Sequence, residues 1–172
     1  MLRAYGPNCH GEIIEANKGQ LIPDDATWID LEEPTHEEDK LVEQCVRVQI
    51  PTREDMSEIE PSSRLYEQNG TLYMTVSALY GVENGHPKSD PISFVLTADR
   101  LVTVRYVTPK PVRAFEHHAR RDPALVQDAG TDAALPMRRR LPRGWWRGQQ
   151  TGAARPPMAV GGRWSLGGDL IQ

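Results

Sequence analysis

The densest group of metal-ligating side chains in this sequence lies within its first quarter. It consists of Asp30, Glu32, Glu33, Glu37, Glu38 and Asp39. Carboxylate oxygens are the ligands that Mg²⁺ accepts, usually together with several waters. The same charges also suit the positive end of a helix dipole, and that local explanation covers every one of them. We therefore expect a solvated helix start, and we retain Asp30, Glu32 and Glu33 as candidate metal ligands.

A second charged block follows Pro51. Its members are Arg53, Glu54, Asp55, Glu58, Glu60 and Arg64. Glu54 and Glu58 stand four residues apart, so they share one face of a helix. Such a block either contacts another helix or a neighbouring subunit, or it forms surface ion pairs that each contribute about 0–1 kcal/mol. The sequence leaves both interpretations open.

Other reactive residues do not assemble into a catalytic or metal-binding pattern. His117 and His118 are adjacent and point about 100° apart on a helix, so they chelate one ion poorly. Cys9 and His10 are equally close and lack partners. The sequence contains no glycine-rich phosphate loop, no GxSxG elbow and no HExxH pair. We predict no catalytic residues, no tightly bound cofactor and no enzymatic activity.

The first sixty residues predict strands that alternate with two capped helices. Residues 1–6, 12–16 and 27–31 have the composition of short strands. Thr35 and Glu38 form a capping box, which predicts a helix through about residue 47. Thr52, with Asp55 facing back, predicts the start of a second short helix that ends before Pro61.

From residue 63 onward, the spacing of the apolar residues changes from a helical period to the alternation of an extended strand. Residues 63–68 and 71–80 flank Asn69-Gly70, the strongest short signal for a hairpin, because both turn positions need positive φ. Both faces of 71–80 are fairly apolar, which predicts a central strand covered on both sides. Residues 81–90 are predicted to be a polar loop.

A second hairpin and a helix complete this pattern. Residues 92–97 and 101–106 read as paired strands, and residues 112–121 as a helix after two prolines. The fold class is therefore α/β, a mixed sheet of about six to seven strands covered by helices.

Composition points to one polar domain in a reducing compartment. The 172 residues are 38% hydrophobic and 26% charged, and the two cysteines form no disulfide framework. No stretch approaches the roughly 20 apolar residues of a spanning helix, and the start lacks a secretory signal. We expect the chain as written to be cytoplasmic.

The last forty residues differ in chemistry from the rest. Residues 1–132 carry 23 acidic and 13 basic residues, whereas 133–172 carry 1 acidic and 7 basic, with three of the four tryptophans. One interpretation is a basic nucleic-acid arm on a free-standing α/β binding module. We favour the other, a shifted reading frame in a GC-rich gene, and expect no nucleic-acid partner. On this view residues 126–172 are a non-native or disordered tail rich in Arg, Gly, Pro and Trp.

Three ordered blocks resemble the N-terminal domain of the CorA family of magnesium transporters. They are residues 28–35 (WIDLEEPT), 50–66 (IPTREDMSEIEPSSRLY) and 101–106 (LVTVRY). The resemblance covers about residues 1–125, and it is specific because the blocks agree in order and spacing. The family's Gly-Met-Asn signature at the pore mouth is absent from this sequence.

The resemblance implies a sheet sandwiched between helices and a homopentamer whose cytoplasmic domains form a funnel at the inner membrane. It implies a following long helix and two membrane spans, which this sequence does not contain. The charged block at residues 53–64 would then contact the long helix or a neighbouring subunit. The resemblance further implies regulatory Mg²⁺ binding between domains, and a fragment that does not transport ions by itself. It leaves the transported cation open among Mg²⁺, Co²⁺, Ni²⁺ and Zn²⁺.

Overall fold

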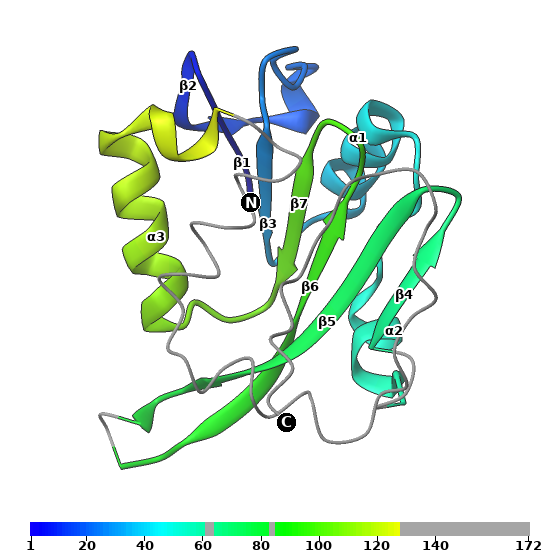
Figure 1. Ribbon diagram of the computed structural model, residues 1–172, viewed down its shortest axis with the longest axis vertical. Helices are drawn as coiled ribbons and strands as arrows, with labels where there is room; N and C mark the ends of the chain where they lie inside the picture. Colours follow the sequence, from blue (N-terminus) through cyan, green and yellow to red (C-terminus); the bar gives the residue numbers. More distant parts are fainter. Residues whose placement is uncertain (61–63, 83–84, 128–172) are drawn as a thin grey trace, which may run out of the picture.

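The computed structural model describes residues 1–60, 64–82 and 85–127 of the chain, and these residues build one mixed seven-stranded sheet (Figure 1). The strands are β1 Leu2–Gly6, β2 Cys9–Ile14, β3 Trp28–Glu32, β4 Leu65–Gln68, β5 Thr71–Tyr80, β6 Lys88–Leu96 and β7 Leu101–Arg105. Their order across the sheet is β2-β1-β3-β7-β6-β5-β4. The β3–β7 pair is parallel and every other pair is antiparallel. The predicted fold class is confirmed.

In the described part of the chain, three α-helices and two 3₁₀ turns lie between or after these strands. They are α1 His36–Val46, α2 Arg53–Glu58, α3 Lys110–Arg121, η1 Ala16–Lys18 and η4 Pro123–Val126. Both predicted capping boxes are present, from Thr35 with Glu38 and from Thr52 with Asp55. Each satisfies backbone N–H groups that a helix start leaves without partners. Glu38 also accepts from Leu2 N and from the Met1 amino group, which ties α1 to β1.

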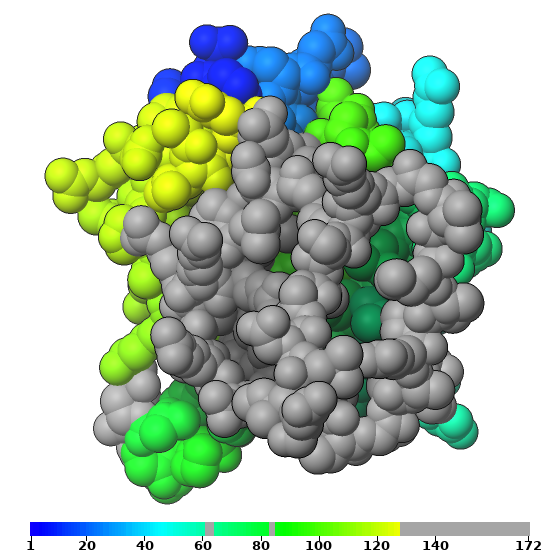
Figure 2. All heavy atoms as spheres, viewed as in Figure 1, coloured from blue at the N-terminus to red at the C-terminus, as the bar shows by residue number. Residues whose placement is uncertain are grey.

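The two faces of the sheet pack against different helices (Figure 1). Side chains alternate between faces along a strand, so Ile29 and Leu31 join the core that includes Val42 of α1 and Met56 of α2. Trp28 points the other way, into a core with Phe115 of α3. At the molecular surface, α3 and the turn after it lie beside the N-terminal strands (Figure 2). Among the described residues, no helix has both the length and the apolar character needed to span a bilayer.

The structure corrects two details of the sequence prediction. The Asn69-Gly70 hairpin is confirmed, with φ of 53° and 76° at the two turn residues. However, β5 is not central: it lies next to the edge strand, and Leu72 and Leu79 on it are exposed. The predicted loop 81–90 was also too long, because residues 88–90 pair with the end of β5.

A buried charge network as the candidate functional site

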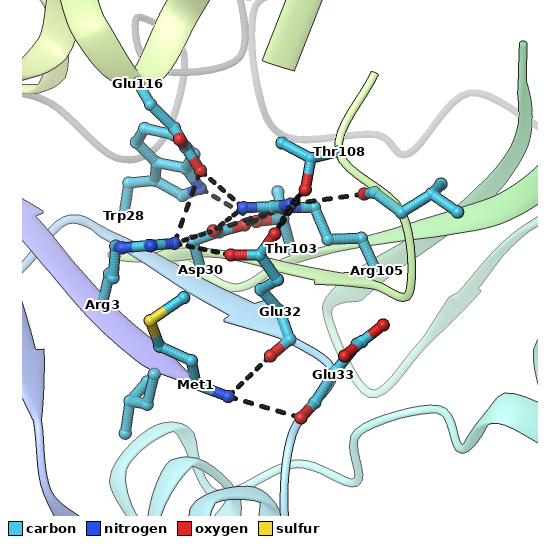
Figure 3. Close-up of polar contacts among 12 residues, drawn as sticks. Met1, Arg3, Trp28, Asp30, Glu32, Glu33, Thr103, Arg105, Thr108 and Glu116 are labelled. Carbon is cyan, nitrogen blue, oxygen red and sulfur yellow. Dashed lines mark hydrogen bonds and ion pairs between the residues drawn. The ribbon is translucent and has the colours of Figure 1, made fainter. Parts of the chain in front are cut away.

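The α3 side of the sheet holds five charged side chains in contact with one another (Figure 3). They are Arg3 from β1, Asp30 and Glu32 from β3, Arg105 from β7 and Glu116 from α3. Strand register brings them together, because β3 and β7 pair in parallel with Asp30 opposite Thr103 and Glu32 opposite Arg105. These positions point to one face of the sheet, and α3 places Glu116 above them.

Arg105 is the centre of this network. Its side chain is completely buried, as is that of Asp30. Its Nε and Nη2 donate to Asp30, with Nη2 at 2.8 Å from Oδ2, and Nη2 also donates to Glu116 Oε1 at 2.5 Å. Its Nη1 donates to Glu32 Oε1 at 2.9 Å, and to the Thr108 hydroxyl and the Val107 carbonyl. A buried guanidinium is tolerated when its fork of donors is satisfied in this way.

Neutral side chains complete the network around the carboxylates. The Trp28 indole N–H donates to Thr103 Oγ1, whose hydroxyl donates to Asp30 Oδ1. The Thr108 hydroxyl donates to Glu32. Arg3 is less well satisfied: its Nη1 donates to Glu32 Oε2 at 2.9 Å, but its buried Nε has no partner among the described residues.

The network shifts the pKa values of its two glutamates in opposite directions. Burial by itself would raise the pKa of Glu32, but the Thr108 hydroxyl and the two arginines lower it to about 2. Burial raises the pKa of Glu116, and the nearby Asp30 charge adds to this against the pull of Arg105 and Arg3. Burial would lower the pKa of Arg105, but its carboxylate partners raise it, so this side chain stays charged. Two arginines therefore face three carboxylates, and Glu116 is the carboxylate whose ionisation is opposed.

This geometry bears directly on the candidate metal ligands. Asp30 and Glu32 do lie together, but their oxygens already accept from arginines and threonines. Glu33 follows them on the chain but is exposed, with φ of 45°. Across the described ranges no group of three or more His, Cys, Asp or Glu side chains is placed to hold a metal ion. The assignment of Mg²⁺ ligands here remains a prediction without support from the geometry.

The second charged block is on the other side of the molecule. Arg53, Glu54, Asp55 and Glu58 are exposed on α2, and Asp55 also caps the helix through Thr52. The Arg53 guanidinium lies 4.9 Å from the centre of the Tyr106 ring. Glu60 is exposed beyond the helix, and Arg64 is half-buried just before β4. The block thus forms one surface, and its role in contacting another element stays a prediction.

Sequence reasoning did not single out Arg3, Arg105 or Glu116. The available signal was a charge inside an apolar strand, such as Asp30 within 28–31 and Arg105 within 101–106. A charged residue that shares the inward register of a strand must find a partner, because an unpaired buried charge is very costly. Two apolar strands that carry inward residues of opposite charge therefore predict an ion pair between those residues.

Comparison with known proteins agrees with the resemblance in the sequence. The magnesium transport protein CorA of Wolinella succinogenes is 32% identical over 83 residues, which cover 46% of this chain and 26% of that protein. The magnesium transport protein CorA of Sodalis glossinidius is 30% identical over 107 residues, covering 61% of this chain and 33% of that protein. The chain therefore spans about a third or less of the curated relatives it matches. No protein-family model matches the sequence.

The fold has a counterpart among solved structures. The soluble domain of CorA from Methanocaldococcus jannaschii superposes with a TM-score of 0.53 at 17% identity, over 80% of this chain and 53% of that chain. The sequence matches and the shared fold together support a CorA-type N-terminal domain in this chain. Within this domain, the buried charge network joins α3 to the sheet through Glu116.

Proposed function

We propose that this chain provides the cytoplasmic regulatory and assembly domain of a CorA-type magnesium transporter, and that it does not conduct ions by itself. The observation that carries the proposal is the match over 107 residues to proteins named magnesium transport protein CorA. The matched residues also have the fold of the soluble domain of an archaeal CorA. A protein of this kind acts at the inner face of the plasma membrane. Its membrane attachment would come from spans outside the residues matched here.

Assembly into a homopentamer is part of the proposal. The exposed block on α2, with Glu60 and Arg64, is the surface that we assign to a long helix or a neighbouring subunit. Its charges make few contacts within the described residues beyond helix capping and the Arg53–Tyr106 stack. Exposed charges without local partners are free to pair across an interface, where they steer association and fix register.

Regulatory Mg²⁺ would have to bind between copies in this proposal. Within one copy, the carboxylates of the buried network are already paired with arginine, and no metal-binding cluster lies elsewhere among the described residues. Exposed carboxylates such as Glu54 and Glu58 can instead contribute oxygen ligands to a hydrated ion shared with a neighbour. No tightly bound cofactor is part of this function.

A graft tests the regulatory role. Residues 1–127 would replace the matched N-terminal segment of the Escherichia coli relative, which is 27% identical over 107 residues. We expect the chimera to take up Mg²⁺ and to slow as internal Mg²⁺ rises. A chimera that assembles but conducts at the same rate at every internal Mg²⁺ concentration would contradict the regulatory role.

A reconstitution tests the statement about conduction. The full 172-residue chain, added to liposomes that enclose a Mg²⁺-sensitive dye, should give no influx above empty liposomes. The complete Escherichia coli relative serves as the positive control. Influx through the full chain would refute the proposal.

A further inference from the structure

The groove between α2 and β4 is acidic and partly aromatic. It encloses about 570 Å³, and its lining residues are Glu43, Gln49, Ile50, Pro51, Thr52, Asp55, Glu58, Ile59, Tyr66, Gln68 and Tyr73. This lining includes three carboxylates and no Lys, Arg or His side chain. The charge of the groove therefore favours a cationic occupant.

The three carboxylates of the groove differ in the contacts that they already make. Glu43 accepts from the backbone N–H of Ile50 at 3.0 Å, and Asp55 accepts from the backbone N–H of Thr52 in the cap of α2. Glu58 is exposed, and no hydrogen bond or ion pair engages its side chain among the described residues. Glu58 is therefore the carboxylate of the groove with the most capacity to bind a cation.

The aromatic part of the groove leaves one ring surface open. Tyr66 and Tyr73 stack with ring centres 4.8 Å apart. Tyr73 is buried, and its hydroxyl donates to the Gln49 carbonyl at 3.3 Å, whereas Tyr66 is 40% exposed. A guanidinium or a second aromatic ring gains a favourable contact on such an exposed ring. The groove thus suits a segment that carries both arginine and aromatic side chains.

The sequence contains such a segment outside the described residues. Residues 143–147 read RGWWR, with an arginine on each side of two adjacent tryptophans. Residues 133–172 carry 7 basic and 1 acidic residue, whereas residues 1–132 carry 13 basic and 23 acidic residues. The segment is therefore opposite in charge to the folded part of the chain and to the groove.

The exposed face of α3 does not suit this segment, because that face is itself basic. Arg113, His117 and Arg121 stand four residues apart and are all exposed, so they line one side of the helix. Glu116, the one acidic residue of α3, points inward to Arg105. Like charges repel, so electrostatics directs the segment away from α3 and toward the groove.

The chain is long enough to bring the segment to the groove. The described residues end at Gln127 after η4, which contacts α3 and β1, whereas β4 is the strand at the other edge of the sheet (Figure 1). A domain of this size has a radius of gyration of about 14 Å, so half its circumference is about 57 Å. A chain extends at most about 3.6 Å per residue, which gives about 58 Å at Arg143, about 72 Å at Arg147 and about 47 Å at Arg140. The segment reaches the groove even by this longest route, and Arg140 does not.

We propose that residues 143–147 of this chain dock into its own α2–β4 groove. The two arginines pair with Glu58 and Asp55, and the indoles pack against the exposed part of Tyr66. Two exposed ion pairs hold separate molecules only weakly. A tether within one chain raises the local concentration of the segment to the order of mM, so the bound form is populated. The bound segment closes the groove to any other partner.

Acrylamide quenching of tryptophan fluorescence in the full chain tests this contact. Every protein carries Trp164→Phe, so that the emission comes from the buried Trp28 and from the tryptophans at 145–146. Glu58→Arg and Arg147→Glu each reverse one charge of a proposed pair, and a third protein carries both reversals. The contact lies within one chain and needs no membrane, so this test is independent of the uptake test.

Each reversal has a matched control. Glu67→Arg makes the same charge change as Glu58→Arg, but on β4, where Glu67 alternates with the groove residues Tyr66 and Gln68 and so lies on the opposite face of the strand. Arg140→Glu makes the same charge change as the reversal in the segment, at a residue that falls short of the groove. Circular dichroism checks that each protein is folded.

We expect acrylamide to quench the reference protein about twofold less efficiently at about 50 mM than at about 500 mM NaCl, because salt screens the exposed ion pairs. At low salt each single reversal should raise the quenching constant to the high-salt value, and the double reversal should return it to the reference value. Both controls should keep the reference value. Shielding should not depend on protein concentration, because the contact forms within one chain.

Four results would overturn the inference. The first is equal quenching of the reference protein at both salt concentrations. The second is a folded double reversal that is quenched like the single reversals, which would show that Arg147 and Glu58 do not meet. The third is loss of shielding in either control, which would indicate a general effect of charge. The fourth is shielding that strengthens with protein concentration, which would place the segment on another molecule.

Discussion

The two faces of this sheet are covered by helices that are attached in different ways. On one face α1 and α2 begin with capping boxes, and each contributes one buried apolar anchor, Val42 and Met56. On the other face α3 has no side-chain cap but places Glu116 into a network of buried charges. Both faces thus have apolar contacts, since α3 also buries Val112, Phe115 and Ala119, but only the α3 side adds a buried charge network with residues from four elements.

This difference predicts how each face responds to change. Apolar contact is non-directional, so a core tolerates substitutions that keep volume and hydrophobicity. A buried charge needs particular partners at particular distances, and removing one partner leaves another charge uncompensated. The charge network under α3 should therefore be sensitive to chemistry, and the apolar anchors of α1 and α2 to volume.

The largest effect is expected at the centre of the network. Arg105→Ala leaves Asp30 and Glu32 without their main cation and should lower the free energy of unfolding by about 3–5 kcal/mol. Arg105→Lys should recover little of this, because one ammonium cannot match the forked contacts of the guanidinium. Urea unfolding at pH 7 measures both variants. Full recovery by lysine would show that charge alone holds α3.

A smaller effect is expected at the apolar anchor of α2. Met56 is 3% exposed, so Met56→Ala should cost about 2–3 kcal/mol through lost burial and a cavity. Met56→Leu, which keeps the volume, should cost less than about 1.5 kcal/mol. The same unfolding measurement applies. If leucine were as damaging as alanine, the proposed contrast between the two faces would fail.

Sequence rules recovered the α1–α2 side because its signals are local. Thr35 with Glu38 and Thr52 with Asp55 are capping pairs three residues apart, and Asn69-Gly70 marks its turn by itself. The position of β5 was wrong because two apolar faces are typical of a central strand, yet its outer neighbour β4 has only four residues. Leu72 is exposed although it pairs with Glu67 of β4.

The charge network could be predicted only in part. Asp30 and Glu32 were noted as carboxylates, but they pair with Arg105, more than 70 residues away, and with Arg3 in the first strand. Only the parallel register of β3 with β7 brings Arg105 to these carboxylates. Patterns within a short window carry no information about that pairing.

The two glutamates of the network offer a finer comparison. The pKa of Glu32 is lowered to about 2 in the folded chain, so its ionised form stabilises the fold above the pKa of the unfolded chain. That stability is lost as pH falls from about 4.5 toward 2. Glu32→Gln should therefore cost about 1–2 kcal/mol at pH 7, after allowance for its partial exposure, and almost nothing near pH 2. Urea unfolding at a series of pH values checks this. An equal cost at both ends would rule out ionisation as the cause.

Substitution of Glu116 should change stability in the opposite direction from Glu32→Gln, and by the smallest amount at pH 7. Its pKa is raised, because burial and Asp30 oppose its ionisation more than Arg105 and Arg3 favour it. The folded chain then holds this proton more tightly than the unfolded chain does, so wild-type stability falls as pH rises from about 4.5 through the raised pKa. The side-chain amide of a Glu116→Gln variant would keep an oxygen for Arg105 Nη2 but carry no charge.

We therefore expect Glu116→Gln to change stability by only about 0–1 kcal/mol at pH 7, toward greater stability, with a difference from wild type that grows as pH rises. The pH series used for Glu32→Gln measures it. Glu32→Gln is the matched control, because that variant is less stable than wild type at pH 7 and its deficit shrinks as pH falls below about 5. If Glu116→Gln instead became less stable than wild type as pH rose, ionised Glu116 would be a net stabilising partner of Arg105. The network would then need its third negative charge, and ionised Glu116 would hold α3 by charge attraction.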